Sequence, residues 1–130
     1  MQEPNPKLRK MRQHRERVGL LMVNTGNGKG KSTASFGMAV RAVGHGMQVH
    51  IVQFIKGSRD AGELHALAKL DGITIERAGE GFTWEVRSDE RQTDLAEWGM
   101  ARVEAAIQAG VDLLILDEVN IVLDLSLIHI

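Results

Sequence analysis

The stretch LLMVNTGNGKGKST, from Leu20 to Thr33, decides the fold of this chain. An apolar run enters a glycine-rich turn that ends in Gly30, Lys31 and Ser32 and leads into helix-forming sequence. Backbone N–H groups of such a turn and of the helix N-terminus can surround an anionic polyphosphate. Lys31 can reach the phosphate oxygens, and the Ser32 hydroxyl can ligate Mg²⁺. The stretch therefore predicts a phosphate-binding loop that takes a nucleoside triphosphate.

This loop is a variant of the strict pattern. That pattern has glycine five positions before Gly30, where this chain has Thr25. The alternative is a glycine-rich surface turn that merely joins a strand to a helix. On the first interpretation the nucleotide is expected to contact Thr25, Gly26, Asn27, Gly28, Lys29, Gly30, Lys31, Ser32 and Thr33.

Composition limits the classes of protein that need to be considered. The chain has 130 residues, 43% of them hydrophobic, which suits one domain with a real core. Its net charge of −1 argues against a wholly basic nucleic-acid-binding surface. It has no cysteine, which excludes disulfides and thiolate metal sites and fits a reducing compartment. No apolar run approaches the roughly 20 residues of a membrane span. A cytoplasmic protein without membrane or nucleic-acid partners is expected.

Residues 1–17 differ from the rest of the chain. They are rich in lysine and arginine and carry few apolar side chains, so they cannot bury themselves. We expect either a solvated basic arm or a helix that becomes ordered on a partner or ligand, such as a triphosphate.

From Val18 onward, apolar runs alternate with helical patterns. Strands are expected over Val18–Asn24 (buried), Gln48–Ile55, Ile73–Glu76 and Val111–Leu116. Helices are expected over Lys31–Val43, Ala61–Leu70 and from Ser88 to about Ala109, with glycine at the helix stops. Strands joined by crossover helices imply parallel pairing and an open, three-layer α/β sheet.

Two carboxylates follow the last predicted strand. Asp117 and Glu118 come directly after an apolar run, and the carboxyl edge of a parallel sheet is where ligands bind. Either one is expected to complete, directly or through water, the Mg²⁺ shell begun by Ser32. The alternative is that they cap the next element. Gln53 and Lys56 stand at the end of the second predicted strand, Gln48–Ile55, and are expected on the same edge.

Five sequence blocks carry a closer resemblance: TGNGKGKST from Thr25, FGMAVRAVGHG from Phe36, VQFIKG from Val52, GFTW from Gly81 and LDEVNIVL from Leu116. In this order they closely resemble the ATP:corrinoid adenosyltransferases of the CobA/CobO/BtuR type, over roughly residues 8–124. The resemblance implies an α/β fold like that of P-loop NTPases (RecA-like), a three-layer sandwich with a mainly parallel sheet.

The resemblance also implies a reaction. Enzymes of this family transfer the 5′-deoxyadenosyl group of ATP to reduced cobalt of a corrinoid and release triphosphate. Cobalt(I) is itself a strong nucleophile, so the protein's tasks are positioning, water exclusion and stabilisation of the leaving group. Lys29 and Lys31 match catalytic positions that neutralise the triphosphate, with Mg²⁺ (or Mn²⁺) bridging its oxygens. A homodimer and a flavoprotein reductant are the implied partners.

Phe82 and Trp84 match a second site of the family. Aromatic residues there face the lower side of the corrin and displace the axial ligand of cobalt(II), which makes the metal easier to reduce. Phe82 and Trp84 suit this role because they are large, apolar and unable to ligate the metal. The alternative is that both cover the edge of the core.

The resemblance stops after Asp124, whereas members of the family usually continue well beyond this point. The final LSLIHI, from Leu125 to Ile130, is what a transposase mosaic-end adapter would encode if translated in frame. We therefore expect three parts: a basic arm (1–17), an incomplete nucleotide-binding domain that lacks C-terminal strands (18–124), and a non-native tail (125–130).

Two other functions remain open from the sequence. One is an ATPase of the recombination or motor type, with the basic arm on nucleic acid and Glu118 orienting water. The other is a nucleotide-sensing module without catalysis. The glycine-flanked aromatic pair Phe82 and Trp84 favours the transferase.

Overall fold

A computed structural model describes residues 18–54, 62–78 and 89–124. The elements, in chain order, are α2 (Lys31–Gly44), β1 (Val49–Gln53), α3 (Gly62–Leu67), β2 (Ile73–Arg77), α4 (Asp89–Ala109), β3 (Leu113–Asp117) and α5 (Val119–Asp124). The predicted basic arm, the loop that carries Phe82 and Trp84, and the final six residues lie outside the described ranges.

The three strands form one parallel sheet in the order β2-β1-β3. Val49 of β1 pairs with Ile73 of β2 and Leu113 of β3, and the register continues to the ends of all three strands. Parallel pairing of alternating strands and helices, as predicted, is confirmed. Since β1 lies between the two strands that follow it, the chain reverses direction across the sheet between β1 and β3. Such a reversal is where open α/β sheets bind ligands, at the carboxyl ends of the strands.

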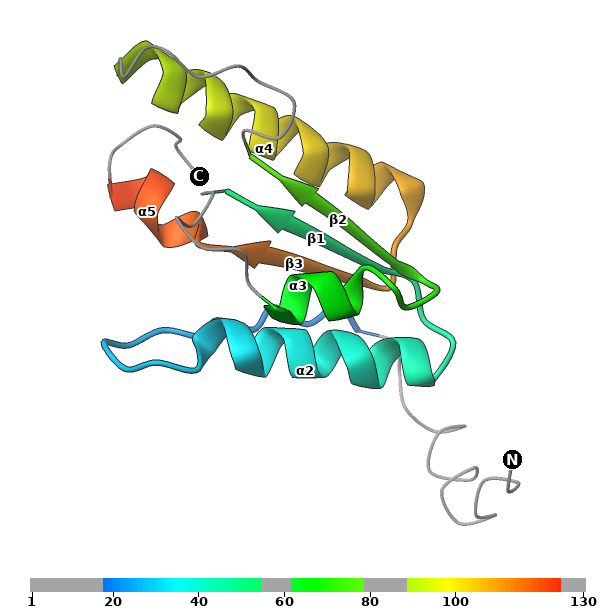
Figure 1. Cartoon of the computed structure of the whole chain (residues 1–130). Helices are drawn as coiled ribbons and strands as arrows, with labels where there is room; N and C mark the ends of the chain where they lie inside the picture. The colour runs from blue at the N-terminus through cyan, green and yellow to red at the C-terminus, as the bar shows by residue number, and fades with distance from the viewer. Residues whose placement is uncertain (1–17, 55–61, 79–88, 125–130) are drawn as a thin grey trace, which may run out of the picture.

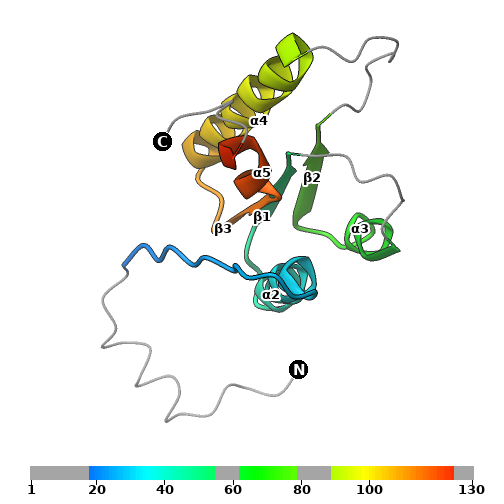
Figure 2. The ribbon, with the colours of Figure 1, turned by 90° about the vertical axis from the view of Figure 1, so that its left-hand side faces the viewer.

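Helices cover both faces of the sheet, which gives three layers (Figure 2). On one face, Phe36 and Ala39 of α2 and Leu64 of α3 pack against Ile51 of β1. On the other face, residues of α4 such as Ala96 and Val103 pack against alternate strand residues, including Val52. Because side chains alternate along a strand, odd-numbered strand residues face α2 and even-numbered ones face α4. This alternation decides which face each polar strand residue reaches.

Glycines lie at the end of α2 and directly before β2. The helix stops at Gly44, and Gly46 takes the left-handed conformation with φ 77°, as the glycine-rich helix stop predicts. Gly72, before β2, has φ 91°, and a Cβ there would lie 3.3 Å from the Met47 carbonyl oxygen. Only glycine combines this conformation with so close an approach, and the turn thereby sets β2 beside β1.

The long helix α4 packs closely on the sheet at one point. Gly99 leaves room for the Phe54 ring, since a Cβ at Gly99 would lie 2.6 Å from a ring carbon. Phe54 is consequently only 1% exposed. Of the helices in the described ranges, α4 included, none has both the length and the apolar character needed to cross a membrane.

The predicted first strand, Val18–Asn24, is wrong in this structure. The segment has no strand pairing, and Val18, Leu20, Leu21 and Val23 are at least 75% exposed. An apolar run forms a buried strand only if a neighbouring strand supplies hydrogen bonds and another layer covers it. Neither is supplied to this segment by the described elements, and the described sheet pairs β1, β2 and β3 alone.

Candidate functional site

The glycine-rich loop lies at the carboxyl edge of the sheet. In Figure 1 the arrowheads of all three strands point toward the end of the molecule where the loop enters α2. Gly26 and Gly30 adopt positive φ angles of 125° and 109°, which glycine tolerates and other residues resist. The loop borders a shallow hollow of about 380 Å³, lined by Val23, Asn24, Thr25, Gly28, Lys29, Gly30, Lys31 and Ala34.

Lys31 reaches back over this loop. Its Nζ donates hydrogen bonds to the carbonyl oxygens of Gly26, at 2.7 Å, and of Gly28, at 2.6 Å. The ammonium group is thus held by two neutral acceptors on the exposed side of the hollow. Phosphate oxygens would be stronger acceptors for it, because a charge-assisted bond at both ends is shorter and stronger. This geometry suits a lysine that exchanges backbone carbonyls for a polyphosphate.

Ser32 and Asp117 meet at the edge of the sheet. Ser32 stands in the first turn of α2, and its Oγ donates to Asp117 Oδ1 at 2.7 Å. Asp117 is an odd-numbered residue of β3, so its side chain lies on the α2 face and is only 8% exposed. Glu118 is the next residue; it is exposed and has a φ of 60°. Of the two predicted carboxylates, the structure brings Asp117 to Ser32.

These two side chains fit a nucleotide-bound Mg²⁺. A hydroxyl and a carboxylate oxygen are hard ligands of the type that Mg²⁺ prefers, and this ion usually takes one or two protein ligands plus phosphates and waters. Within residues 18–54, 62–78 and 89–124, no group of three or more histidine, cysteine or acidic side chains could hold a metal alone. The donor set therefore fits an ion that arrives with a phosphate ligand.

A row of polar residues extends the site across the sheet. Gln53 Nε2 donates to Asp117 Oδ2 at 3.0 Å, and Arg77 Nε donates to Gln53 Oε1 at 2.9 Å. Arg77, Gln53 and Asp117 are register partners at the ends of β2, β1 and β3. Gln53 was predicted on this edge, whereas Arg77 was not. The third predicted strand, Ile73–Glu76, ended one residue before Arg77, whereas β2 extends to Arg77.

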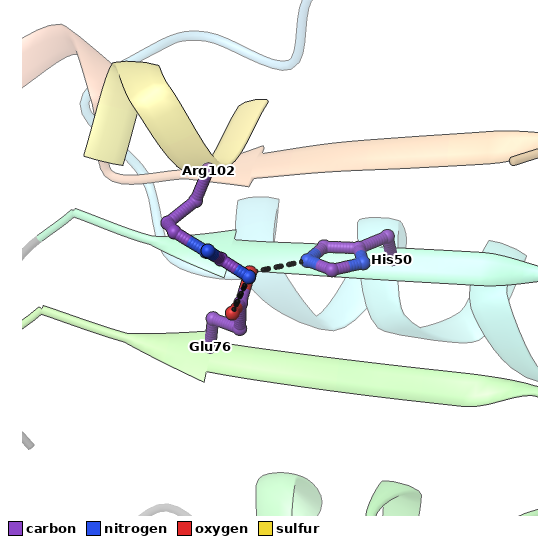
Figure 3. A network of polar contacts seen from close by, with 3 residues as sticks. All are labelled: His50, Glu76 and Arg102. Atoms are coloured by element: carbon purple, nitrogen blue, oxygen red, sulfur yellow. Dashed lines mark hydrogen bonds and ion pairs between the residues drawn. The ribbon is translucent and has the colours of Figure 1, made fainter. Parts of the chain in front are cut away.

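A second polar network lies on the opposite face of the sheet (Figure 3). Glu76 of β2 contacts His50 Nε2 of β1 at 2.7 Å and Arg102 of α4 at 2.6 Å. Burial acts to raise the pKa of Glu76, but the hydrogen bonds and charges of Arg102 and His50 outweigh it and lower the pKa below 4.5. The network ties α4 to two strands and takes no part in the loop site.

Four other predicted site residues lie in the loop or just after it. Thr25 and Lys29 line the hollow, whereas Thr33 lies exposed on α2 and Asn27 is exposed in the loop. Phe82, Trp84 and Lys56 lie outside the described residues. One contact was not foreseen: Asn24 Nδ2 donates to Ser35 Oγ at 2.9 Å and fastens the segment before the loop to α2.

Fold and site together define a class: an α/β protein that presents a lysine-bearing glycine loop and a buried aspartate at the carboxyl edge of a parallel sheet. Comparison with known proteins narrows this class. Residues 17–130 match the family described as ATP:corrinoid adenosyltransferase BtuR/CobO/CobP. The chain belongs to this family, as the sequence blocks predicted.

Individual relatives agree with the family match. The chain is 46% identical over 118 residues to a corrinoid adenosyltransferase of Pseudomonas aeruginosa, covering 88% of this chain and 57% of the relative. It is 43% identical over 110 residues to the corrinoid adenosyltransferase CobA of Salmonella typhimurium, covering 83% and 55%. A corrinoid adenosyltransferase of Escherichia coli is 41% identical over the same shares of the two chains. The chain thus spans about half the length of the curated relatives it matches.

Proposed function

We propose that the protein transfers the 5′-deoxyadenosyl group of ATP to cobalt(I) of a corrinoid and releases triphosphate, in the synthesis or salvage of adenosylcobalamin. Family membership supports the reaction, and the named relatives are corrinoid adenosyltransferases. The structural observation that carries the proposal is the contact of Ser32 with Asp117 beside the lysine-bearing loop. A RecA-like P-loop fold is part of the same proposal.

In this proposal the loop binds a leaving group. Corrinoid cobalt(I), the second substrate, attacks C5′ of ATP, and the C5′–O bond breaks with its electron pair passing to the triphosphate. Backbone N–H groups of the loop, with Lys29 and Lys31, stabilise the negative charge that grows on the triphosphate. Ser32 and Asp117 would hold Mg²⁺, which supplies further positive charge to the phosphate oxygens. The protein needs no general base, because the nucleophile carries no proton to remove.

The remaining parts of the proposal concern residues and partners beyond the described site. Phe82 and Trp84 would cover the lower face of the corrin and exclude an axial ligand from cobalt(II). The resemblance further implies a homodimer, a flavoprotein as electron donor and a cytoplasmic location. We propose no membrane or nucleic-acid partner.

The deciding experiment identifies the products. The protein, in the longest form that its gene encodes, is incubated without oxygen with ATP, Mg²⁺ and chemically reduced cob(I)alamin. We expect a cobalt–carbon bond in the absorption spectrum and one inorganic triphosphate for each adenosyl group transferred. ADP and orthophosphate, released faster when DNA is added, would instead identify a nucleic-acid-dependent ATPase and overturn the proposal. The comparisons lend that second function no support.

A further inference from the structure

Hydrogen bonds connect the polar row at the carboxyl edge in the order Arg77, Gln53, Asp117. Gln53 lies in the middle, with the Arg77 guanidinium on one side and the Asp117 carboxylate on the other. Gln53 and Asp117 are both 8% exposed, so water competes little for their polar atoms. The row ends at Ser32, which shares Asp117 with Gln53.

The two charges fix the orientation of the Gln53 amide. Arg77 donates to the amide oxygen, and that oxygen can only accept; the amide nitrogen therefore points toward Asp117 and donates to it. If the amide turned over, its NH₂ group would face the guanidinium and its oxygen would face the carboxylate. Both contacts would be repulsive. Arg77 thus determines which atom Gln53 presents to Asp117.

The orientation of Gln53 in turn fixes Asp117. Oδ2 accepts from Gln53 at 3.0 Å, which leaves Oδ1 directed at Ser32 at 2.7 Å. Without the bond to Oδ2, the carboxylate could rotate about its Cβ–Cγ bond and accept from Ser32 in several orientations. Partners that hold a ligating carboxylate in place contribute to metal affinity although they do not touch the metal.

We propose that Gln53 and Arg77 are positioning residues that hold the Asp117 carboxylate ready for the Mg²⁺ carried by ATP. Gln53 acts on Asp117 directly, and Arg77 acts through Gln53. The row crosses the ends of β2, β1 and β3, and its Gln53–Asp117 contact joins β1 to β3, where the strand order reverses and a ligand would bind. This inference rests on the proposed function, because it assumes a metal-bound triphosphate in the loop.

The test measures metal-dependent nucleotide binding and needs no corrinoid. Binding of a fluorescent ATP analogue to the protein, in the longest form that its gene encodes, is titrated with Mg²⁺ and repeated in EDTA. For Gln53→Met, which has a similar length but neither donor nor acceptor, the Mg²⁺ concentration for half-maximal binding should rise about tenfold. Binding in EDTA should change little, and Arg41→Met, on exposed α2, serves as the matched control.

Two further variants separate positioning from folding. Arg77→Met should also raise the Mg²⁺ concentration for half-maximal binding. Arg77→Lys keeps a donor for Gln53, so its Mg²⁺ requirement should lie close to that of the wild-type protein. Because Arg77 acts through Gln53, the double variant Gln53→Met/Arg77→Met should be no worse than Gln53→Met alone. Thermal unfolding of each variant shows whether it is folded.

Several results would overturn the proposal. They are an unchanged Mg²⁺ requirement in folded Gln53→Met, an equal loss of binding in EDTA, or additive effects of the two substitutions. Failure of the proposed function looks different: the wild-type protein would bind ATP with Mg²⁺ and form no cobalt–carbon bond, while the effect of Gln53 on the metal requirement would persist.

Discussion

Ser32 and Asp117 are 85 positions apart in the sequence, yet the serine hydroxyl donates a 2.7 Å hydrogen bond to the aspartate. The contact joins the first turn of α2 to the end of β3. It thereby brings the glycine loop and the acidic strand end, two separate signals in the sequence, into a single site.

Asp117→Asn should remove metal-dependent nucleotide binding. The amide keeps the size of the buried side chain but loses the charge that attracts Mg²⁺, so the Mg²⁺-linked gain in ATP affinity should fall by about tenfold or more. Equilibrium titration with and without Mg²⁺ measures it. Glu118→Gln, an exposed neighbour, is the matched control. A larger effect of Glu118→Gln would make Glu118 the ligand.

Lys31→Ala should abolish turnover. Loss of a cation that stabilises the developing charge of the leaving group typically costs about 10²–10³ in rate. Adenosyl transfer from ATP to cob(I)alamin under single-turnover conditions measures the chemical step. Lys69→Ala removes an exposed lysine outside the loop and should leave the rate almost unchanged. A near-normal rate for Lys31→Ala would refute its role.

Replacing both Phe82 and Trp84 by alanine should distinguish the two oxidation states of the corrinoid. If the aromatic pair excludes an axial ligand, the double variant should lose far more activity with cobalt(II) and a reductant than with pre-reduced cobalt(I). The absorption spectrum of bound cob(II)alamin reports axial ligation directly. Equal losses with both substrates would show that the pair only supports the core.

Glu76→Gln should destabilise the protein in a pH-dependent manner. Burial opposes ionisation, but Arg102 and His50 together hold the pKa of Glu76 below 4.5, so the folded state binds the proton less tightly than the unfolded state. The stabilisation is therefore present above the unfolded pKa and is lost as the pH falls through the lowered folded value. We expect a loss of about 1–2 kcal/mol near neutral pH, at the low end for charged hydrogen bonds since Arg102 is 42% exposed.

Urea unfolding at a series of pH values measures this difference. The gap between wild type and Glu76→Gln should shrink as the pH falls below 4.5. Glu104→Gln, on the exposed side of α4, should change the free energy of unfolding little at any pH. A gap that does not depend on pH would assign the effect to packing instead of charge.

Two helix glycines should respond to alanine with opposite signs. A Cβ at Gly99 would lie 2.6 Å from the buried Phe54 ring, so Gly99→Ala should destabilise the fold by about 1–3 kcal/mol through overpacking. Gly37 in α2 has no atom within 4 Å of the added Cβ. Gly37→Ala should stabilise by about 0.5–1 kcal/mol, because alanine restricts the unfolded chain. Chemical unfolding measures both, and equal effects would refute the predicted Gly99–Phe54 contact.

Local sequence patterns predicted most of the secondary structure. The glycine stop of α2, the start of α4 and the three strands were found to within a few residues, because caps, glycines and apolar alternation act over short distances. The lysine-bearing loop was recognisable for the same reason: its function depends on backbone conformations that neighbouring glycines allow. Family membership followed from the order of these local blocks.

Contacts between distant strands were beyond the sequence patterns. The choice of Asp117 over Glu118, the alignment of Arg77 with Gln53, and the exposure of Val18–Val23 all depend on which strands become neighbours and in which register. A shift of one residue in β1, β2 or β3 would send Gln53, Arg77 or Asp117 to the opposite face of the sheet. The sequence by itself determined most of the elements and the lysine-bearing glycine loop, whereas only the tertiary structure decided which polar side chains meet at the sheet edge, because register is a property of paired strands.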